Sequence, residues 1–307
     1  CAGGDRPMTS RDFEVRLADA GDTAAVLSAL SDGYVRPFTA DWFEWKHRSN
    51  PWGASRCWVA EDDGGLLGVV FGMPWHLIDN GAPLTCWRLV DGATTVRAQR
   101  RGVFRAVVQA ELAAAAADTA PGLVIATATP EARDAHVKNG ATALPSIQSY
   151  YRPVRWTPGR THAGVDVLDS WQPPAGGITT AWSPEALRWR LDGRGGAPAT
   201  ISALSNTDES HGAVHRTVGG AARTLVVSAT WGPERTVRRL LRALAWQEKA
   251  VAVLAPAGPG ARRGKPALAL ARGASLLCVW DQRTAPGSTV DGLDHWRLDG
   301  LDLEGVV

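Results

Sequence analysis

The segment 85–117 constrains the fold more than any other part of the chain. A strand-like stretch, 85–95, leads into Gln-Arg-Arg-Gly at 99–102, and apolar residues then recur at helical spacing as far as Ala117. The first N–H groups of a helix have no partner within the helix, and the helix dipole adds partial positive charge there. The pattern therefore predicts an anion site at the helix start, suited to a diphosphate.

Two residue types in this loop fit a bound anion. Gly102 has no Cβ, so a ligand can approach the main chain closely. Arg97, Arg100 and Arg101 supply forked donors that match phosphate oxygens. An ordinary arginine-rich helix start with solvated charges fits the same residues, so the loop by itself leaves both interpretations open.

An approximate repeat indicates two related halves. The chain has 307 residues, enough for two domains. The segment 42–46 aligns with 186–190, and each copy is followed by a proline, a strand, a polar turn and a second strand. The stretch 157–177 is rich in proline and glycine. We therefore expect an N-terminal domain at 8–156, a linker at 157–177 and a C-terminal domain at 178–307.

Charge and composition exclude several classes of protein. Lys and Arg number 33 against 31 Asp and Glu, which argues against a nucleic-acid binder. No apolar run reaches the length of a membrane span, so we expect no membrane partner and a cytoplasmic location. The four cysteines form no CxxC pair and predict no metal site. Residues 1–7, including Cys1, precede Met8 and are expected to be a leader or an expression remnant.

The loop and its context resemble the GNAT superfamily of acyl-CoA-dependent N-acyltransferases. The family signature, Q/R-x-x-G-x-G/A between the fourth strand and the third helix, is matched by Gln99, Gly102 and the intervening arginines. Phe104 stands where the signature ends in a small residue. The segments 42–72 and 90–96 also look like the family. The resemblance covers roughly 13–152, with a fainter version at 180–307.

The resemblance implies an α/β (α+β) fold of two tandem GNAT-like domains, each a mixed, mostly antiparallel sheet flanked by helices. It implies transfer of an acyl group from acetyl-CoA or another acyl-CoA, without a metal, to the amine of a small molecule such as an amino sugar or a secondary metabolite. The thioester would lie in a splay between the fourth and fifth strands, near 89–93 and 125–127. The implied co-substrate-binding residues are Leu89, Val90, Thr95, Val96, Gln99, Arg100, Arg101, Gly102, Val103 and Phe104.

Catalytic candidates follow from the same resemblance. The family often places a proton donor four residues before the glycine that ends the next helix, and counting back from Gly140 gives His136 as general acid. Tyr150 and Tyr151 are alternative donors. Asp91 on the catalytic strand is the candidate base, and Glu61 and Glu44 are weaker candidates. A surface histidine at 136, a structural hydrogen bond at 91 and deprotonation by water are the competing interpretations.

The second half lacks the phosphate-loop pattern. Its corresponding helix starts Trp231-Gly232-Pro233-Glu234, where proline removes an N–H group and glutamate opposes an anion. We therefore expect this half to bind no CoA and to shape the acceptor site. Trp45, Trp75 and Trp87 are candidate substrate-binding residues, with packing in the core as the alternative.

Two other classes of function fit a tandem GNAT fold. One is a non-catalytic protein that binds CoA or a metabolite. The other is a Fem-like transferase that uses aminoacyl-tRNA, against which the near-zero net charge argues. Whatever the class, we expect a monomer or a homodimer that contacts a small-molecule amine and no nucleic acid.

Overall fold

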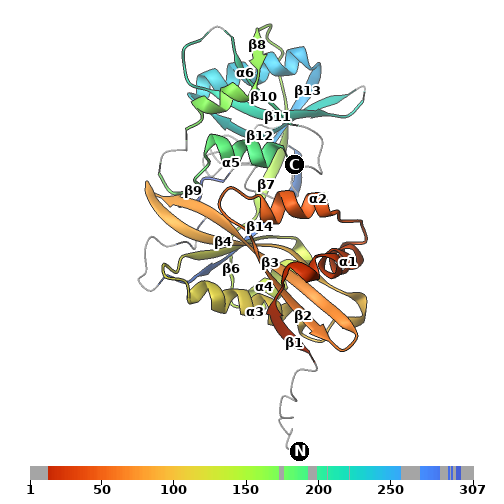
Figure 1. The fold of residues 1–307 in the computed structure, drawn as a ribbon. Helices are drawn as coiled ribbons and strands as arrows, with labels where there is room; N and C mark the ends of the chain where they lie inside the picture. Colours follow the sequence, from red (N-terminus) through yellow and green to blue (C-terminus); the bar gives the residue numbers. More distant parts are fainter. Residues whose placement is uncertain are drawn as a thin grey trace, which may run out of the picture.

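The computed structural model describes most of the chain (Figure 1). The described residues are 13–172, 176–192, 199–205, 207–220, 222–256, 270–283, 290, 292 and 295–298. Cys1 and the expected leader before Met8 lie outside this part. Within it, two mixed sheets flanked by helices confirm the expected fold class.

The first sheet has four antiparallel strands followed by a parallel one. Its strands are β1 (Glu14–Leu17), β2 (Arg56–Asp62), β3 (Gly65–Asp79), β4 (Ala82–Thr94) and β5 (Leu123–Ala128). Turns at 62–65 and 79–81 join β2 to β3 and β3 to β4. Helix α3 (Val103–Ala116) carries the chain from β4 to β5, because parallel neighbours need a crossover connection.

The second sheet repeats this order. Its strands are β8 (Thr161–Ala163), β10 (Thr200–Leu204), β11 (Gly212–Val218), β12 (Arg223–Trp231) and β13 (Ala250–Pro256). β10, β11 and β12 are antiparallel, and α6 (Glu234–Gln247) connects β12 to the parallel β13. The order of three antiparallel strands, a helix and a parallel strand thus occurs in both sheets.

Two strands join the sheets. β7 (Ile147–Pro153) lies between β13 and β14 (Leu270–Asp281), and the end of β14 pairs with β5. A strand from near the end of the chain therefore completes the first sheet. Two short strands, β6 (Thr142–Ala143) and β9 (Ile178–Thr180), pair with β14 and β3.

The stretch 157–177 is not the simple linker expected from its prolines and glycines. Residues 161–163 form β8, which pairs with β10 at the edge of the second sheet. Residues 165–170 form a 3₁₀ turn whose Val167 and Leu168 are buried. Backbone pairing and two apolar side chains order a segment that has little periodicity in sequence, and 173–175 lie outside the described residues.

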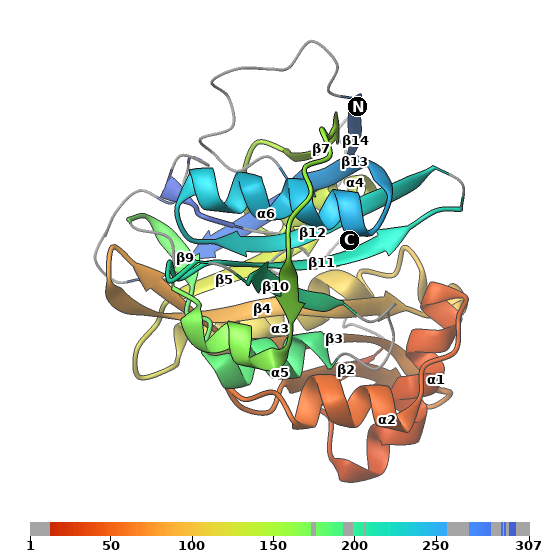
Figure 2. The same cartoon turned by 90° about the horizontal axis from the view of Figure 1, so that it is seen from above.

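Helices cover both faces of the two sheets. The first half contributes α1 (Thr23–Tyr34), α2 (Ala40–Phe43) and α4 (Pro130–Lys138), and the second contributes α5 (Pro184–Leu191). Figure 1 shows α2 and α5 between the two halves, and Figure 2 shows α6 on the outer side of β12. One apolar cluster includes Phe43 from α2, Leu187 from α5 and Val90 from β4, so both halves share a core.

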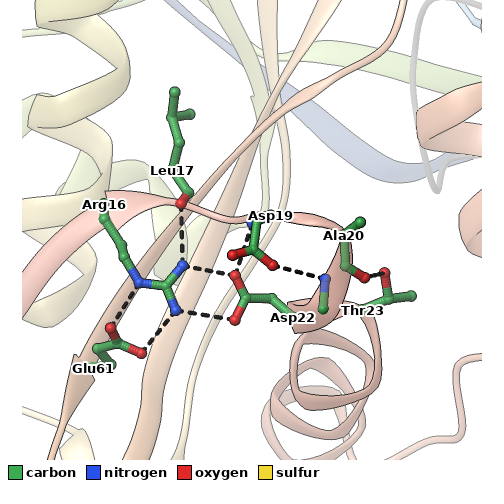
Figure 3. A network of polar contacts seen from close by, with 8 residues as sticks. Arg16, Leu17, Asp19, Ala20, Asp22, Thr23 and Glu61 are labelled. Carbon is green, nitrogen blue, oxygen red and sulfur yellow. Dashed lines mark hydrogen bonds and ion pairs between the residues drawn. The ribbon is translucent and has the colours of Figure 1, made fainter.

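An arginine ties the start of α1 to the edge of the first sheet (Figure 3). Arg16 on β1 donates to both carboxylate oxygens of Asp22 and of Glu61, at 2.6–3.0 Å. These paired donors lower the pKa of Asp22 to about 2. Asp19 accepts from the Gly21 N–H, so the turn before α1 is capped.

Candidate functional site

β4 and β5 separate at the point that the sequence indicates. Their parallel pairing runs from Cys86 opposite Leu123 to Leu89 opposite Ala126. Beyond it, β4 stays paired with β3 as far as Thr94, whereas β5 continues beside β14. The two strands thus diverge over 90–94 and 127–128, where each keeps only its outer neighbour.

A bulge in β4 lies on this divergence. Val69 of β3 faces Ala93 and Phe71 faces Val90, so two residues of β4, Asp91 and Gly92, stand opposite one residue of β3. Asp91 has a φ of 49°, an uncommon conformation for a residue with a side chain. A bulge leaves an extra residue outside the ladder and redirects the strand. The main chain at 90–92 is therefore free of regular pairing on the β5 side.

The side chain of Asp91 is held in a buried ion pair. Its Oδ2 lies 2.7 Å from Lys46 Nζ and 3.3 Å from His47 Nε2, and all three side chains are at most 10% exposed. Burial alone would raise the pKa of Asp91. The charge of Lys46 and the contacts from Lys46 and His47 outweigh burial and hold the pKa well below its usual range. Asp91 is therefore a weak proton acceptor, unlike the base expected from sequence.

The Gln-Arg-Arg-Gly loop leads directly into α3. A 3₁₀ turn, Val96–Ala98, follows β4, and Gly102 at φ 80° is the N-terminal cap of α3. A Cβ on Gly102 would have no heavy atom within 4 Å, so the approach to the helix start is open. Arg97 and Arg101 lie 3.0 and 3.4 Å from Asp62, on the neighbouring hairpin. The open helix start and the two arginines fit a phosphate group.

His136 lies at the other side of the divergence. Its ring on α4 packs edge-on against Phe104 of α3 and Trp280 of β14, with centroids 5.5 and 5.3 Å away. Phe104 in turn lies close to Gly92, where a Cβ would come within 2.9 Å of the ring. Burial lowers the pKa of His136 to about 4, and its Nδ1 has no hydrogen-bond partner. The neutral ring, rather than the charged acid, is the form present near pH 7.

Comparison with known proteins identifies this arrangement. Residues 14–132 match the family model of an acetyltransferase (GNAT) domain, from β1 to the start of α4. Residues 14–132 therefore carry a GNAT-type acetyltransferase domain. Among curated protein sequences, none matches it.

Solved structures share the fold over most of the chain. A protein from Enterococcus faecalis described as a "Probable N-Acyltransferase" has 14% identity and a TM-score of 0.68, covering 88% of this chain and 72% of its own. A GCN5-related N-acetyltransferase from Anabaena variabilis has 9% identity and a TM-score of 0.70, covering 88% and 73%. Eis1 from Mycobacterium abscessus has 14% identity and a TM-score of 0.62, with the same coverage. At these identities the likeness is one of fold.

The three tryptophans expected to bind substrate make contacts within the protein. Trp75 is 1% exposed and donates to Thr180, so it presents no free face. Trp87 donates to Asp118, and the guanidinium of Arg56 lies 3.5 Å above its ring. Trp45 stacks on Trp189. For Trp75 the expectation is wrong, because the second half covers it through β9.

The remaining base and acid candidates are also placed by the structure. Glu61 is bound to Arg16, and Glu44 accepts weakly from Ser49 at 3.4 Å. Tyr150 and Tyr151 lie on β7 opposite Ala255 and Leu254, in the strand that joins the two sheets. His136 stays the candidate donor, as the sequence predicts.

Sequence reasoning missed Lys46 and His47. Both lie on a π-helical turn, Glu44–Arg48, that continues α2, and they are 6% and 1% exposed. A lysine and a histidine within Trp-Lys-His-Arg are expected on a solvated helix face, because charged side chains are seldom buried. π-Helical turns often occur at functional sites, but they leave no clear sequence signal.

The described residues show neither a cluster of metal ligands nor a helix that could span a membrane. Among them, no three His, Cys, Asp or Glu side chains gather as metal ligands. No helix in that part of the chain is long and apolar enough to cross a membrane.

Proposed function

We propose that this GNAT protein transfers an acyl group, acetyl in the first instance, from acyl-CoA to the amine of a small molecule. The observation that carries the proposal is the divergence of β4 and β5 beside the Asp91 bulge. Where two strands separate, the unpaired main-chain groups can form hydrogen bonds with pantetheine and its thioester, as they would with an added strand. The loop at 99–102 opens onto the same end of β4.

The co-substrate would contact main chain more than side chains. Its diphosphate would lie at the start of α3, against the N–H groups that follow Gly102, with Arg100 and Arg101 adding charge. Thr95 and Val96 begin the turn that leads there. Leu89 is the last residue of β4 that pairs with β5, and Val90 is the first beyond that pairing; both would face the thioester. Val103, the first residue of α3, is buried, and Phe104 lies close to Gly92 in the bulge. These two side chains therefore shape the site by packing.

The reaction would proceed by direct attack. The neutral amine adds to the thioester carbonyl carbon, and the carbonyl oxygen gains negative charge. An N–H group of the bulge in β4 would donate to this oxygen; one such donor is worth roughly 100- to 1,000-fold in rate. The C–S bond then breaks, leaving CoA thiolate and an amide. The amine proton passes to water and on to the thiolate, so protons balance.

His136 would assist the leaving sulfur. With a pKa of about 4 the ring is neutral near pH 7, so it offers an N–H hydrogen bond rather than an imidazolium proton. Its unpartnered Nδ1 leaves one ring nitrogen available for such a bond. This assignment of His136 rests on its place between Trp280 and Phe104, the second of which lies close to Gly92.

The second half would enclose the acceptor and bind no CoA. The corresponding helix, α6, has Pro233 as its N-terminal cap and Glu234 in its first turn. Proline removes an N–H group and glutamate repels an anion. The acceptor would therefore bind where the two halves share their core, on the α2 and α5 side of β4.

Binding and turnover test the proposal separately. The melting temperature is measured with acetyl-CoA, a longer acyl-CoA and ATP as a phosphate control. We expect both acyl-CoA compounds to raise it and ATP at equal concentration to raise it less. Release of CoA thiol is then followed with a panel of amines that holds amino sugars and aromatic amines. Absence of any shift with acyl-CoA would count against the proposal.

A matched pair of variants assigns the binding to the loop. Arg100→Ala/Arg101→Ala is expected to weaken the shift with acetyl-CoA, whereas Arg133→Ala, an exposed arginine on α4, leaves it unchanged. Binding by the wild-type protein without turnover of any amine would favour the non-catalytic CoA-binding function instead.

A further inference from the structure

The Lys46–Asp91 ion pair connects two unusual backbone segments. Asp91 has a positive φ within the β4 bulge, and Lys46 lies on the π-helical turn after α2. A positive φ at a residue with a side chain persists where the surroundings impose it, and a π-helical turn is a rare interruption of an α-helix. A conformation of this kind on each side of one buried ion pair indicates that the pair holds both in place.

His47 strengthens the same contact from the other side. Its Nε2 lies 3.3 Å from Asp91 Oδ2, and its Nδ1 lies 3.1 Å from Ser55 Oγ. The ring stacks on Phe71, the β3 residue opposite Val90 and next to the bulge, with centroids 3.8 Å apart and planes 18° apart. His47 therefore contacts both strands of the bulge and is itself oriented by Ser55.

The second half of the chain reaches this turn through Trp189. Trp189 donates to the carbonyl oxygen of Trp45, the residue before Lys46, and Trp45 donates back to Trp189. Both hydrogen bonds anchor the π-helical turn to α5. The segment that carries Lys46 and His47 is thus fixed between β4 on one side and the second half on the other.

We propose that Lys46 and His47 are positioning residues, which hold Asp91 in its left-handed conformation and so aim the main-chain N–H groups of the bulge at the reacting carbonyl. This inference rests on the acyltransferase function proposed above. It assigns Asp91 a structural charge rather than the role of base. The ion pair with Lys46 stabilises the charged carboxylate of Asp91, so Asp91 stays bound to Lys46 and does not take up the proton of the amine.

Replacing Asp91 with glycine separates the effect of the backbone conformation from the effect of the buried charge. Lys46→Met leaves Asp91 buried without its cation, and it is expected to lower kcat by about tenfold to 100-fold with KM for acetyl-CoA within about twofold. Glycine adopts a positive φ at little cost. Lys46→Met/Asp91→Gly should therefore regain most of kcat. Lys46→Met/Asp91→Ala, which removes the buried charge but disfavours a positive φ, should regain part of the melting temperature but little kcat. Lys46→Arg, which keeps the charge, should lose less than Lys46→Met.

A second buried ion pair supplies the control. Arg56 and Glu111 lie 2.7 Å apart on the α3 side of the same sheet, and Glu111 is fully buried. Glu111→Gln is expected to lower the melting temperature and leave kcat unchanged. If Lys46→Met behaves as Glu111→Gln does, the pair only stabilises the fold and the inference is overturned. If Asp91→Gly abolishes turnover in every background, Asp91 is the base and the inference is again overturned.

Hydrogen exchange gives a readout that needs no activity. In the wild-type protein and in Glu111→Gln, amides of a peptide covering 86–94 should exchange slowly. In Lys46→Met they should exchange at least about tenfold faster, because the bulge is no longer held. Unchanged exchange in Lys46→Met overturns the inference even in a protein without measurable turnover. Absence of acyl-CoA binding by the wild-type protein, with faster exchange in Lys46→Met, overturns only the proposed function.

Discussion

Trp45 and Trp189 each donate an indole N–H hydrogen bond to the other's main-chain carbonyl oxygen. The distances are 3.0 and 2.9 Å, and the rings stack with centroids 5.5 Å apart. These are equivalent residues of the internal alignment, 144 positions apart. Equivalent residues that contact each other reciprocally lie at an approximate twofold axis, as in an isologous interface between two copies.

The Trp45–Trp189 pair should stabilise the contact between the two halves. Trp45→Phe and Trp189→Phe each remove one part-buried hydrogen bond, so each should lower the free energy of unfolding by about 1 kcal/mol. The double variant should lose less than the sum, because the rings also share one contact. Urea denaturation measures all three. Trp246→Phe, at an exposed position on α6, serves as the control and should change little.

His136 should make stability depend on pH. Its folded-state pKa is about 4 against 6.5 for an unperturbed histidine, so between these values the unfolded chain binds more protons. Stability therefore rises with pH over this range, and up to about 3 kcal/mol is lost as pH falls from above 6.5 to below 4. His136→Phe should flatten that part of the profile, measured as urea midpoints. His76→Phe, at an exposed position, should leave the slope intact.

The loop arginines should act on co-substrate binding and not on the chemical step. Arg101→Met is expected to raise KM for acetyl-CoA several-fold with kcat unchanged, since a diphosphate contact is equal in ground state and transition state. The effect should shrink at high salt, because the contact is exposed. A fall in kcat with KM unchanged would show that Arg101 acts at the reacting centre instead.

Gly92 should tolerate no side chain while Phe104 is present. A Cβ there would lie 2.9 Å from the Phe104 ring, and overpacking of this kind typically costs about 1–3 kcal/mol. Gly92→Ala should lower the melting temperature and kcat, and Gly92→Ala/Phe104→Leu should recover both in part. At Gly220 a Cβ meets nothing within 4 Å, so Gly220→Ala is a neutral comparison. No recovery in the double variant would show that the clash lies elsewhere.

The two halves should differ in CoA binding. Pro233 and Glu234 at the start of α6 predict a single CoA per chain, bound by the first half. Isothermal titration with acetyl-CoA measures the stoichiometry. Two equal sites per chain would contradict the assignment, and so would loss of binding on Glu234→Gln with the 99–102 loop intact.

Local sequence patterns predicted most of the elements. The strand-like stretch at 85–95 and the helix that ends near Ala117 correspond to the second part of β4 and to α3, where periodicity places them. The element order of the second half followed from the alignment of 42–46 with 186–190. These features depend on residues that are close in sequence, so they can be predicted from a single sequence.

The site itself was only partly predictable. Gly102 and the loop before α3 lie as expected, because they belong to one strand–turn–helix unit. The sequence does not show whether a tryptophan is exposed or buried by a distant segment, so it could not predict that Trp75 is buried. The partner of Asp91 was missed because Lys46 is 45 residues earlier on another element.

The sequence by itself determined the repeated order of elements, the phosphate-type loop and its absence from the second half, since each is written in neighbouring residues. Only the tertiary structure decided that β14 completes the first sheet, that Trp189 holds Trp45, and that Lys46 neutralises Asp91. Strand exchange and buried charge pairs join residues far apart in the chain. Their free energy depends on burial and distance, which appear only when the chain has folded.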